Sequence, residues 1–467
     1  MGQSDATAGK TTALIVMTMA SFLTPLALAA VNVALPSIGK EFSMDAISLG
    51  WVATAYLLSA AVFIVPAGRL ADIYGRKKVF LIGITIFTTA SFFMGIAGSP
   101  FMIIFFRVIQ GIGGSTLFGI SVAILSSVFP PGERGKVLGI VTAAVYLGLS
   151  GGPFVGGILT QHLGWRSVFL LNVPFGIIMA SSTMWKLKGE WAGARGEKFD
   201  LVGSCIYSLM LLAVMYGFSH LPGLPGFLLV ALGIVGIVAF VRWEERTDNP
   251  VLEIGLFKSN RVFAFSNAAT LVHYSATFTV AFLLSFYLQY IKGLSAQNAG
   301  FVLVSQPIVQ AAFSPLAGRV SDRIEPRIVA SAGMAITALG LFLLAVLAKD
   351  GMPLVFIVMS QAVLGFGFAF FSSPNTNAIM GSVDDRFYGV ASSVVATMRV
   401  VGQMFSMGVA MLIFTVLIGR VEITPLYYPQ LEKAVRVAFT LSGLLCVAGV
   451  YASLCGGRPG LCSTGSG

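Results

Sequence analysis

Fourteen apolar runs, each long enough to cross a lipid bilayer, follow one another along the chain and leave little room for anything else. A membrane-spanning helix needs roughly 20 apolar residues. We predict these runs at residues 12–34, 48–68, 78–97, 101–126, 137–160, 167–186, 200–218, 224–241, 264–290, 298–317, 328–348, 352–373, 388–418 and 435–454. The predicted fold class is therefore all-α, a polytopic membrane protein embedded in a lipid bilayer.

The scarcity of charge supports this prediction. Only 10% of the 467 residues are Asp, Glu, Lys or Arg, and 56% are hydrophobic, whereas a soluble domain has about a quarter of its residues charged. The sequence contains no metal-ligand spacing, no GxxxxGK[ST] phosphate loop and no GxSxG elbow. We therefore expect no enzymatic activity, no metal, no cofactor and no ATP-driven pumping.

The net charge of +10 arises from short basic clusters between the apolar runs rather than from one amphipathic face. Nucleic acid is therefore not the expected partner. If the N-terminus is cytoplasmic, 20 of the 29 Lys and Arg residues fall inside, 7 fall outside and 2 lie within spans. Because cytoplasmic connections carry an excess of positive charge, we predict a multi-pass protein of the cell membrane with both termini cytoplasmic.

An internal repeat divides the chain into two parts. The heptapeptide PAGRLAD, from Pro66 to Asp72, reappears 250 residues later as LAGRVSD. Eight predicted spans separate the two copies, so two spans are inserted between pseudo-symmetric six-helix halves, a plan known for transporters with the substrate site between the halves. The predicted domains are residues 1–186 (first six-helix bundle), 187–258 (linker and two extra helices), 259–455 (second six-helix bundle) and 456–467 (disordered tail).

The repeated heptapeptide is a candidate conformational latch. We predict that it lies in the connection after the second span. There Gly68 permits close helix approach, Gly75, three residues beyond the heptapeptide, permits a tight turn, and Asp72 accepts hydrogen bonds from basic groups or caps a helix. The alternative is a solvated loop that only sets topology. The second copy favours the latch, whose residues are Gly68, Arg69, Asp72, Gly75, Arg76, Gly318, Arg319 and Asp322.

Small residues fill the fifth span in the pattern GxxxxxxxxGxxxGPxxGG. In lipid, small residues let a neighbouring helix approach closely, and a proline inside the helix frees a backbone carbonyl and favours a kink. General helix packing explains one GxxxG but not the whole pattern. Its members are Gly139, Gly148, Gly152, Pro153, Gly156 and Gly157.

These strings resemble the major facilitator superfamily and, within it, the fourteen-helix drug:proton antiporters. GRLADIYGRKK resembles the family's loop signature, and the fifth-span glycines resemble its antiporter motif. Further similar strings are Val31–Pro36 (VNVALP), Arg107–Gly111 (RVIQG), Trp165 and Arg166 with Phe169, Asn172 and Pro174, and Gly389–Ser393 (GVASS) with Arg399 and Gly402. The resemblance implies export of small amphipathic, drug-like compounds by alternating access in exchange for protons.

One departure from the family pattern concerns the coupling of protons. The family often has an Asp shortly before the VNVALP string, and here those residues are Leu26 to Ala30 (LALAA). All 19 acidic residues fall in predicted loops or at span ends. An intramembrane acid is the simplest device for coupling protons and attracting a cationic drug. Its absence argues against organic cations, and buried arginines favour anionic, zwitterionic or neutral solutes.

Few polar residues remain inside the predicted spans as candidates for coupling or for a substrate cavity. Arg107 and Arg399 either contact the solute or hold helices together through backbone carbonyls. His273 is either a proton carrier or a polar packing residue. Aromatic residues such as Tyr56 and Tyr146 are expected mostly in packing, with a few lining the cavity. The full candidate set is Arg107, Gln110, His273, Arg399 and Asn32.

Three functions remain open from the sequence. The first is a secondary active exporter of small amphipathic compounds, with protons as the coupling ion. The second is a carrier or facilitator of organic anions or metabolites without strict proton coupling. The third is a membrane receptor or scaffold that does not transport. A scaffold predicts a collapsed interior, whereas a transporter predicts a central cavity lined by Arg107, His273 or Arg399.

Overall fold

A computed structural model of the chain describes residues 3–187, 189–248, 250–252, 254–349, 351–384 and 388–455. Within these ranges the chain is mostly helical, and the β-type pairing that is described is a single bridge between Asp45 and Glu422. Fourteen helical segments of the described residues are long and apolar enough to cross a membrane. The prediction of an all-α, fourteen-span fold is therefore confirmed.

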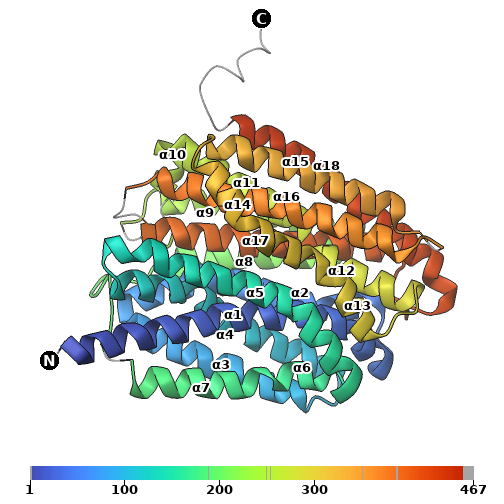
Figure 1. The fold of residues 1–467 in the computed structure, drawn as a ribbon, viewed down its shortest axis with the longest axis horizontal. Coiled ribbons are helices and arrows are strands. Elements are labelled where there is room, and N and C mark those ends of the chain that lie inside the picture. Colours follow the sequence, from blue (N-terminus) through green and yellow to red (C-terminus); the bar gives the residue numbers. More distant parts are fainter. Residues whose placement is uncertain are drawn as a thin grey trace, which may run out of the picture.

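The first half of the chain forms six spans, drawn in blue to green in the lower part of Figure 1. Its helix α1 packs along α5, and α4 packs against both α2 and α3. Two short helices, α6 and α7, make up the sixth span. The bounds are α1 (Gln3–Phe42), α2 (Ala46–Tyr74), α3 (Arg76–Gly95), α4 (Pro100–Val128), α5 (Pro131–Leu163), α6 (Arg166–Leu170) and α7 (Asn172–Trp185).

The second half repeats this plan in the upper part of Figure 1. Here α11 packs along α17, and α16 packs against both α14 and α15. The helices are α11 (Arg261–Thr277), α12 (Thr279–Phe286), the π-helical turn η1 (Tyr287–Ile291), α13 (Ala296–Leu303), α14 (Ser305–Ser321), α15 (Pro326–Leu347), α16 (Leu354–Gly381), α17 (Tyr388–Leu417), the 3₁₀ turn η3 (Pro425–Tyr427) and α18 (Tyr428–Cys455). The same helix pairs are therefore in contact in both halves.

The inserted segment consists of α8 (Leu201–Phe218), α9 (Leu224–Glu244) and the short α10 (Ile254–Ser259). Helix α8 contacts α2 of the first half and α17 of the second. The Tyr207 hydroxyl donates to the Ala61 carbonyl at 2.9 Å, and Gly408 lies against Met215 and Phe218. Helix α9 packs on α8 and exposes most of its apolar side chains, as expected of a lipid-facing span. The predicted domain boundaries stay a prediction, and the predicted tail, residues 456–467, lies outside the described residues.

Short polar residues start several spans where the apolar runs begin. The Asp45 carboxylate accepts from the backbone N–H groups of Ile47 and Ser48, both at 2.9 Å. Ser99 and Asp200 cap α4 and α8 in the same way. Such side chains satisfy the N–H groups that have no partner within the first turn of a helix. The three helices begin within two residues of the starts predicted from the apolar runs, residues 48, 101 and 200.

The two ends of the bundle differ. We call the end where α2 passes into α3 the latch end, on the left in Figure 1, and the opposite end the far end. At the far end the halves are joined: the Ala46 N–H donates to the Val421 carbonyl at 3.1 Å, and the Gln289 amide donates to the Val33 carbonyl at 3.0 Å. At the latch end a cavity lies between the halves, described below.

Candidate functional site

A small cavity of about 50 Å³ lies between the two halves. Helices α1, α2, α4 and α5 of the first half line it, together with α11 and α17 of the second. Its walls are mostly apolar or aromatic, and Arg399 is the one charged residue in its described lining. The interior at this point is therefore not fully packed, and one of the predicted site residues, Arg399, lines the space.

The Arg399 guanidinium retains free hydrogen-bonding capacity. One terminal nitrogen donates to the Thr376 hydroxyl at 3.2 Å, and the group lies over the Tyr274 ring, 5.7 Å from its centre. The buried Nε atom has no hydrogen-bond partner among the described residues. Because a guanidinium carries five N–H donors, a ligand in the cavity would find a cationic donor group available.

A hydrogen bond crosses between the halves near this cavity. The Tyr146 hydroxyl of α5 and the Ser372 hydroxyl of α16 lie 2.7 Å apart. Sequence reasoning mentioned Tyr146 and Tyr56 only as span aromatics, and it missed Tyr274, Thr376 and Gln403 entirely. Polar residues of these types are too common in spans to be singled out without knowing which face of a helix they occupy.

Arg107 is placed differently from Arg399. It is 1% exposed, and its Nε donates to the Val52 carbonyl of α2 at 2.8 Å. Its terminal nitrogen donates to the Gln110 amide oxygen at 2.7 Å, and the Gln110 amide donates to the Ser91 hydroxyl of α3 at 2.8 Å. The structure thus brings Arg107 and Gln110 together in a network that ties three helices of one half. This geometry agrees with the helix-tying alternative, while the Tyr56 ring, 4.5 Å from the guanidinium, connects Arg107 to the cavity wall.

His273 and Asn32 lie apart from both arginines in the contacts that the structure describes. The His273 ring is fully buried and stacks on Phe371 with ring centres 3.9 Å apart. Both its nitrogens lack a hydrogen-bond partner among the described residues, which agrees with the packing alternative. Asn32 is 3% exposed on α1, and its amide oxygen likewise has no described partner.

The prediction that the first latch copy is a loop is wrong, because most of it is helical. Helix α2 continues to Tyr74, and α3 begins at Arg76, so Gly75 alone interrupts the helices. The φ of Gly75 is +114°, a backbone conformation that residues with a side chain rarely adopt. The predicted tight turn requires such a conformation. The close helix approach expected at Gly68 is absent in this conformation, since no described atom lies within 4 Å of a Cβ built there.

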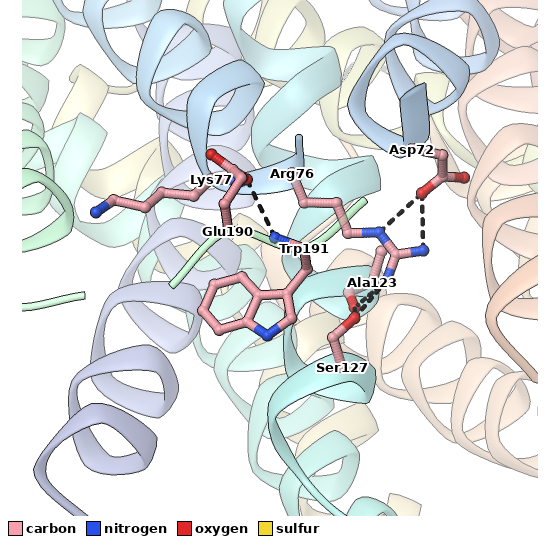
Figure 2. Close-up of polar contacts among 7 residues, drawn as sticks. All are labelled: Asp72, Arg76, Lys77, Ala123, Ser127, Glu190 and Trp191. Atoms are coloured by element: carbon pink, nitrogen blue, oxygen red, sulfur yellow. Dashed lines mark hydrogen bonds and ion pairs between the residues drawn. The ribbon is translucent and has the colours of Figure 1, made fainter. Parts of the chain in front are cut away.

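The Arg76 side chain joins the end of α2 to α4. Figure 2 shows it pointing toward Asp72 and Ser127. Its Nε and one terminal nitrogen contact the same Asp72 oxygen at 2.8 and 2.7 Å. The other terminal nitrogen donates to the Ala123 carbonyl at 3.0 Å and to the Ser127 hydroxyl. These are charge-assisted contacts, which are stronger than neutral ones.

The linker, residues 189–197, covers this latch copy. The Glu190 carboxylate accepts from the backbone N–H groups of Lys77 and Lys78 at 2.8 and 3.2 Å and so caps α3. The Arg76 N–H donates to the Trp191 carbonyl at 2.8 Å. Figure 2 shows Arg76 and Trp191 beside Glu190. Arg69 pairs with Glu197 at 2.6 Å. The sequence predicted a linker here but gave no sign that it contacts the latch.

The second latch copy lacks the same arrangement in the residues described. Gly318, Arg319 and Asp322 lie at the end of α14, and no described ion pair joins Arg319 to Asp322. Arg327 instead pairs with its neighbour Glu325, at 2.5 and 2.8 Å. The two copies are therefore alike in sequence but not in contacts.

The latch-end cavity measures about 260 Å³. From the first half, Arg69, Asp72 and Arg76 line it. From the second half, Val390, Ser393 and Val394 of α17 line it, and residues 250–252 of the inserted segment complete the wall. The first latch copy thus faces the opposite half across this cavity.

The fifth-span glycines lie mainly against α1. A Cβ at Gly148, Gly152 or Gly156 would collide with Phe22, Ala29 or Ala30. Gly157 instead faces the other half, where a Cβ would lie 2.7 Å from the Ala296 carbonyl of α13. The Pro153 carbonyl of α5 packs on Gly300 of α13. Gly139 has no described atom within 4 Å of a Cβ built on it. Part of the pattern thus forms the far-end contact between the halves.

Comparisons with known proteins agree with this architecture. A family model described as Major Facilitator Superfamily matches residues 17–243 and 267–459. The riboflavin transporter RibZ of Clostridioides difficile is 30% identical over 83% of this chain and 84% of its own length. The multidrug resistance protein Stp of Mycobacterium tuberculosis is 31% identical over 87% of this chain and 75% of its own length.

A solved structure shows the same fold. A bacterial homologue of the human lysosomal transporter Spinster, in an inward-facing and unoccupied conformation, superposes with a TM-score of 0.71 over 96% of this chain and 97% of that one, at 14% identity. Family membership argues against the receptor or scaffold alternative, because the matched proteins are transporters. The chain belongs to the major facilitator superfamily: it is a membrane transporter that resembles the superfamily's drug-efflux members.

Proposed function

We propose that this transporter exports small amphipathic compounds across the cytoplasmic membrane by alternating access, in exchange for protons, with both termini in the cytoplasm. The observation that carries the proposal is the cavity between the halves. It combines apolar and aromatic walls with one cationic donor group, Arg399, that has an unpartnered N–H group. Sites of this composition accept many amphipathic molecules and orient them through a few polar contacts.

The closed far end supports alternating access. Backbone contacts join the halves there, including the Ala46 to Val421 hydrogen bond, while the 260 Å³ cavity lies between them at the latch end. With cytoplasmic termini, this conformation faces inward. Export direction is supported by the similarity to a multidrug resistance protein and by the fifth-span glycine pattern.

The charge of the cavity favours solutes that are not cationic. Every described acidic residue inside a helix lies near one of its ends, and the described cavity lining contains Arg399 but no carboxylate. An unpaired cation in a low-dielectric site attracts anions and repels cations. Anionic, zwitterionic or neutral amphipaths are therefore the proposed substrates.

The test uses purified protein in liposomes with a pH-sensitive dye inside. Anionic, neutral and cationic amphipaths are added in turn, with and without an imposed proton gradient. We expect uptake of anionic or neutral compounds to move protons in the opposite direction. Arg399→Gln should lower transport of an anion roughly tenfold or more, because a charge-assisted hydrogen bond is worth about 1.5–3 kcal/mol.

Arg420→Gln is the matched control, since Arg420 is an exposed arginine beyond the end of α17. Its transport should equal that of the unchanged protein. Equal transport by the Arg399 and Arg420 variants would contradict the assigned site. Solute-dependent exchange that is strongest for cations would contradict the proposed solute class.

A second candidate function is a carrier of organic anions or metabolites without proton coupling. The observation that favours it is the described cavity lining, in which Arg399 has no carboxylate beside it to bind the coupling proton. The similarity to a riboflavin transporter is consistent with a metabolite as solute. In the same liposomes, solute flux that leaves the internal pH unchanged would favour this second candidate.

A further inference from the structure

Two carboxylates lie together at the latch end of the inserted helices. Asp200 immediately precedes α8, and Glu244 is the last residue of α9. They are 9% and 4% exposed. Acidic side chains are rarely this buried unless a cation or a proton neutralises them.

The hydrogen bonds of Asp200 and Glu244 involve all of their carboxylate oxygens except one, Glu244 Oε1. Asp200 accepts from the Gly203 N–H at 2.9 Å and from the Trp243 indole at 3.0 and 3.2 Å. Glu244 Oε2 accepts from the Leu252 N–H at 2.9 Å. Glu244 Oε1 is buried and has no hydrogen-bond partner among the described residues. A buried polar atom without a partner is costly, so this oxygen calls for an explanation.

The unpartnered oxygen lies toward Asp200. A Cβ built on Gly203 would overlap both Asp200 Oδ2 and Glu244 Oε1. Both oxygens therefore face the position that a side chain at residue 203 would take, and they can do so because residue 203 has none. Two ionised carboxylates in such a position repel each other, and this repulsion favours a proton on one of them.

Nearby charge does not balance the pair. Among the described residues, the charged groups that act on Glu244 are Asp200 and Arg69 of α2. Arg69 is itself held by Glu197 at 2.6 Å. The Arg69 guanidinium thus acts on two carboxylates, Glu197 of the linker and Glu244 of α9. A proton shared by Asp200 and Glu244 supplies part of the missing positive charge.

We propose that Asp200 and Glu244 hold one proton between them, bound to Glu244 Oε1 and donated to Asp200 Oδ2, and that this proton exchanges with water at the latch end. Its release leaves both groups ionised and strengthens the pull on Arg69. Because Arg69 belongs to the latch and lines the 260 Å³ cavity, the charge of the pair acts on the space between the halves. The use of this proton in transport rests on the proposed function, but its presence does not.

The test is infrared spectroscopy of the full-length protein in lipid at neutral pH without any solute. We expect one carbonyl band from a protonated carboxylic acid, lost in Glu244→Gln and lost or shifted in Asp200→Asn. The matched control is Glu245→Gln, because Glu245 is the neighbouring acid, exposed and paired with Lys258 at 2.7 Å. That variant should keep the band.

A spectrum without such a band, or a band that persists in both Glu244→Gln and Asp200→Asn, would overturn the proposal. Loss of the band on adding sodium at constant pH would assign the pair to a metal cation instead. The proton fluxes described above are measured separately. A band with no solute-driven flux would leave the site in place and reject proton antiport, whereas flux with no band would support antiport and reject this site.

Discussion

The two copies of the latch share the string GR followed three residues later by Asp, yet they hold their helices in different ways. In the first copy the Arg76 guanidinium links Asp72 to the carbonyl of Ala123 and the hydroxyl of Ser127 on α4. In the second, Pro326 stands 250 residues after Arg76, where no guanidinium is available. A neutral hydrogen bond, from the Asn377 amide to the Ser321 hydroxyl at 3.0 Å, joins α14 to α16 instead.

The difference shows that the repeat fixes the helix framework but not the polar contacts on it. Both copies end a helix at the latch end, and both pack against the helix two spans along. Only the first is contacted by the linker, residues 189–197, which follows the sixth span. Control of the latch end is therefore concentrated in the first half.

The largest expected effect comes from Arg76→Ala. The substitution removes charge-assisted hydrogen bonds to two helices from a side chain that is 19% exposed, and we expect the free energy of unfolding to fall by about 2 kcal/mol. Arg327→Ala in the second copy removes one ion pair to a half-exposed Glu325 and should cost less than about 1 kcal/mol. Thermal unfolding in detergent compares the two, and equal losses would refute the asymmetry.

The next effect concerns the linker. Glu190→Ala removes the acceptor for two N–H groups at the start of α3, a loss of about 1 kcal/mol. It should also release the linker, so that proteolysis at the exposed Arg195 becomes faster. Glu325→Ala is the comparison, because Glu325 precedes α15 without capping it through its side chain. Unchanged proteolysis in the Glu190 variant would show that the linker is held by other contacts.

A smaller effect is expected from Asn377→Ala. The bond to Ser321 is neutral, and its loss should lower the free energy of unfolding by about 0.5 kcal/mol, the low end for a neutral hydrogen bond. Because no charge is involved, the loss should be the same at low and high salt, whereas the cost of Arg76→Ala should shrink as salt rises. Unfolding measured at both salt concentrations checks this. A salt-dependent loss for Asn377→Ala would mean that the second copy also relies on charge.

The smallest effect is expected from Glu197→Gln. Its ion pair with Arg69 is short, but the Glu197 side chain is 45% exposed, and exposed pairs contribute about 0–1 kcal/mol. Stability should therefore hardly change. A loss comparable to that of Arg76→Ala would place Arg69, rather than Arg76, at the centre of the latch.

Hydropathy and the repeat were sufficient to predict the fold, because apolar spans and short polar caps such as Asp45 and Ser99 are local features of the sequence. The helical course of the latch was not predicted. The charged residues Arg69 and Asp72 suggested a loop, yet residues 69–74 continue α2 beyond the apolar run, and the helix ends at Gly75 with its positive φ. Hydropathy locates the membrane-embedded part of a helix, not the ends of the helix.

The candidate site was predicted only in part, because its geometry depends on the rotation of each helix. Arg107 and Arg399 looked equivalent in the sequence, but one ties helices within a half and the other lines the cavity. Glu244 was classed with the acids at span ends. Its burial depends on the chain near Leu252 returning over the end of α9, a contact between segments that no spacing rule describes.

The position of α8 has a consequence for solutes that dissolve in the bilayer. By packing on both α2 and α17, α8 occupies the seam where these two helices meet. On the other side, α5 meets α13 and α14 with no inserted helix covering the contact within the described residues. A lipophilic compound that approaches sideways from the hydrocarbon region therefore meets an inserted helix at the seam of α2 and α17, whereas at the seam of α5 and α14 it meets only the helices of the two halves.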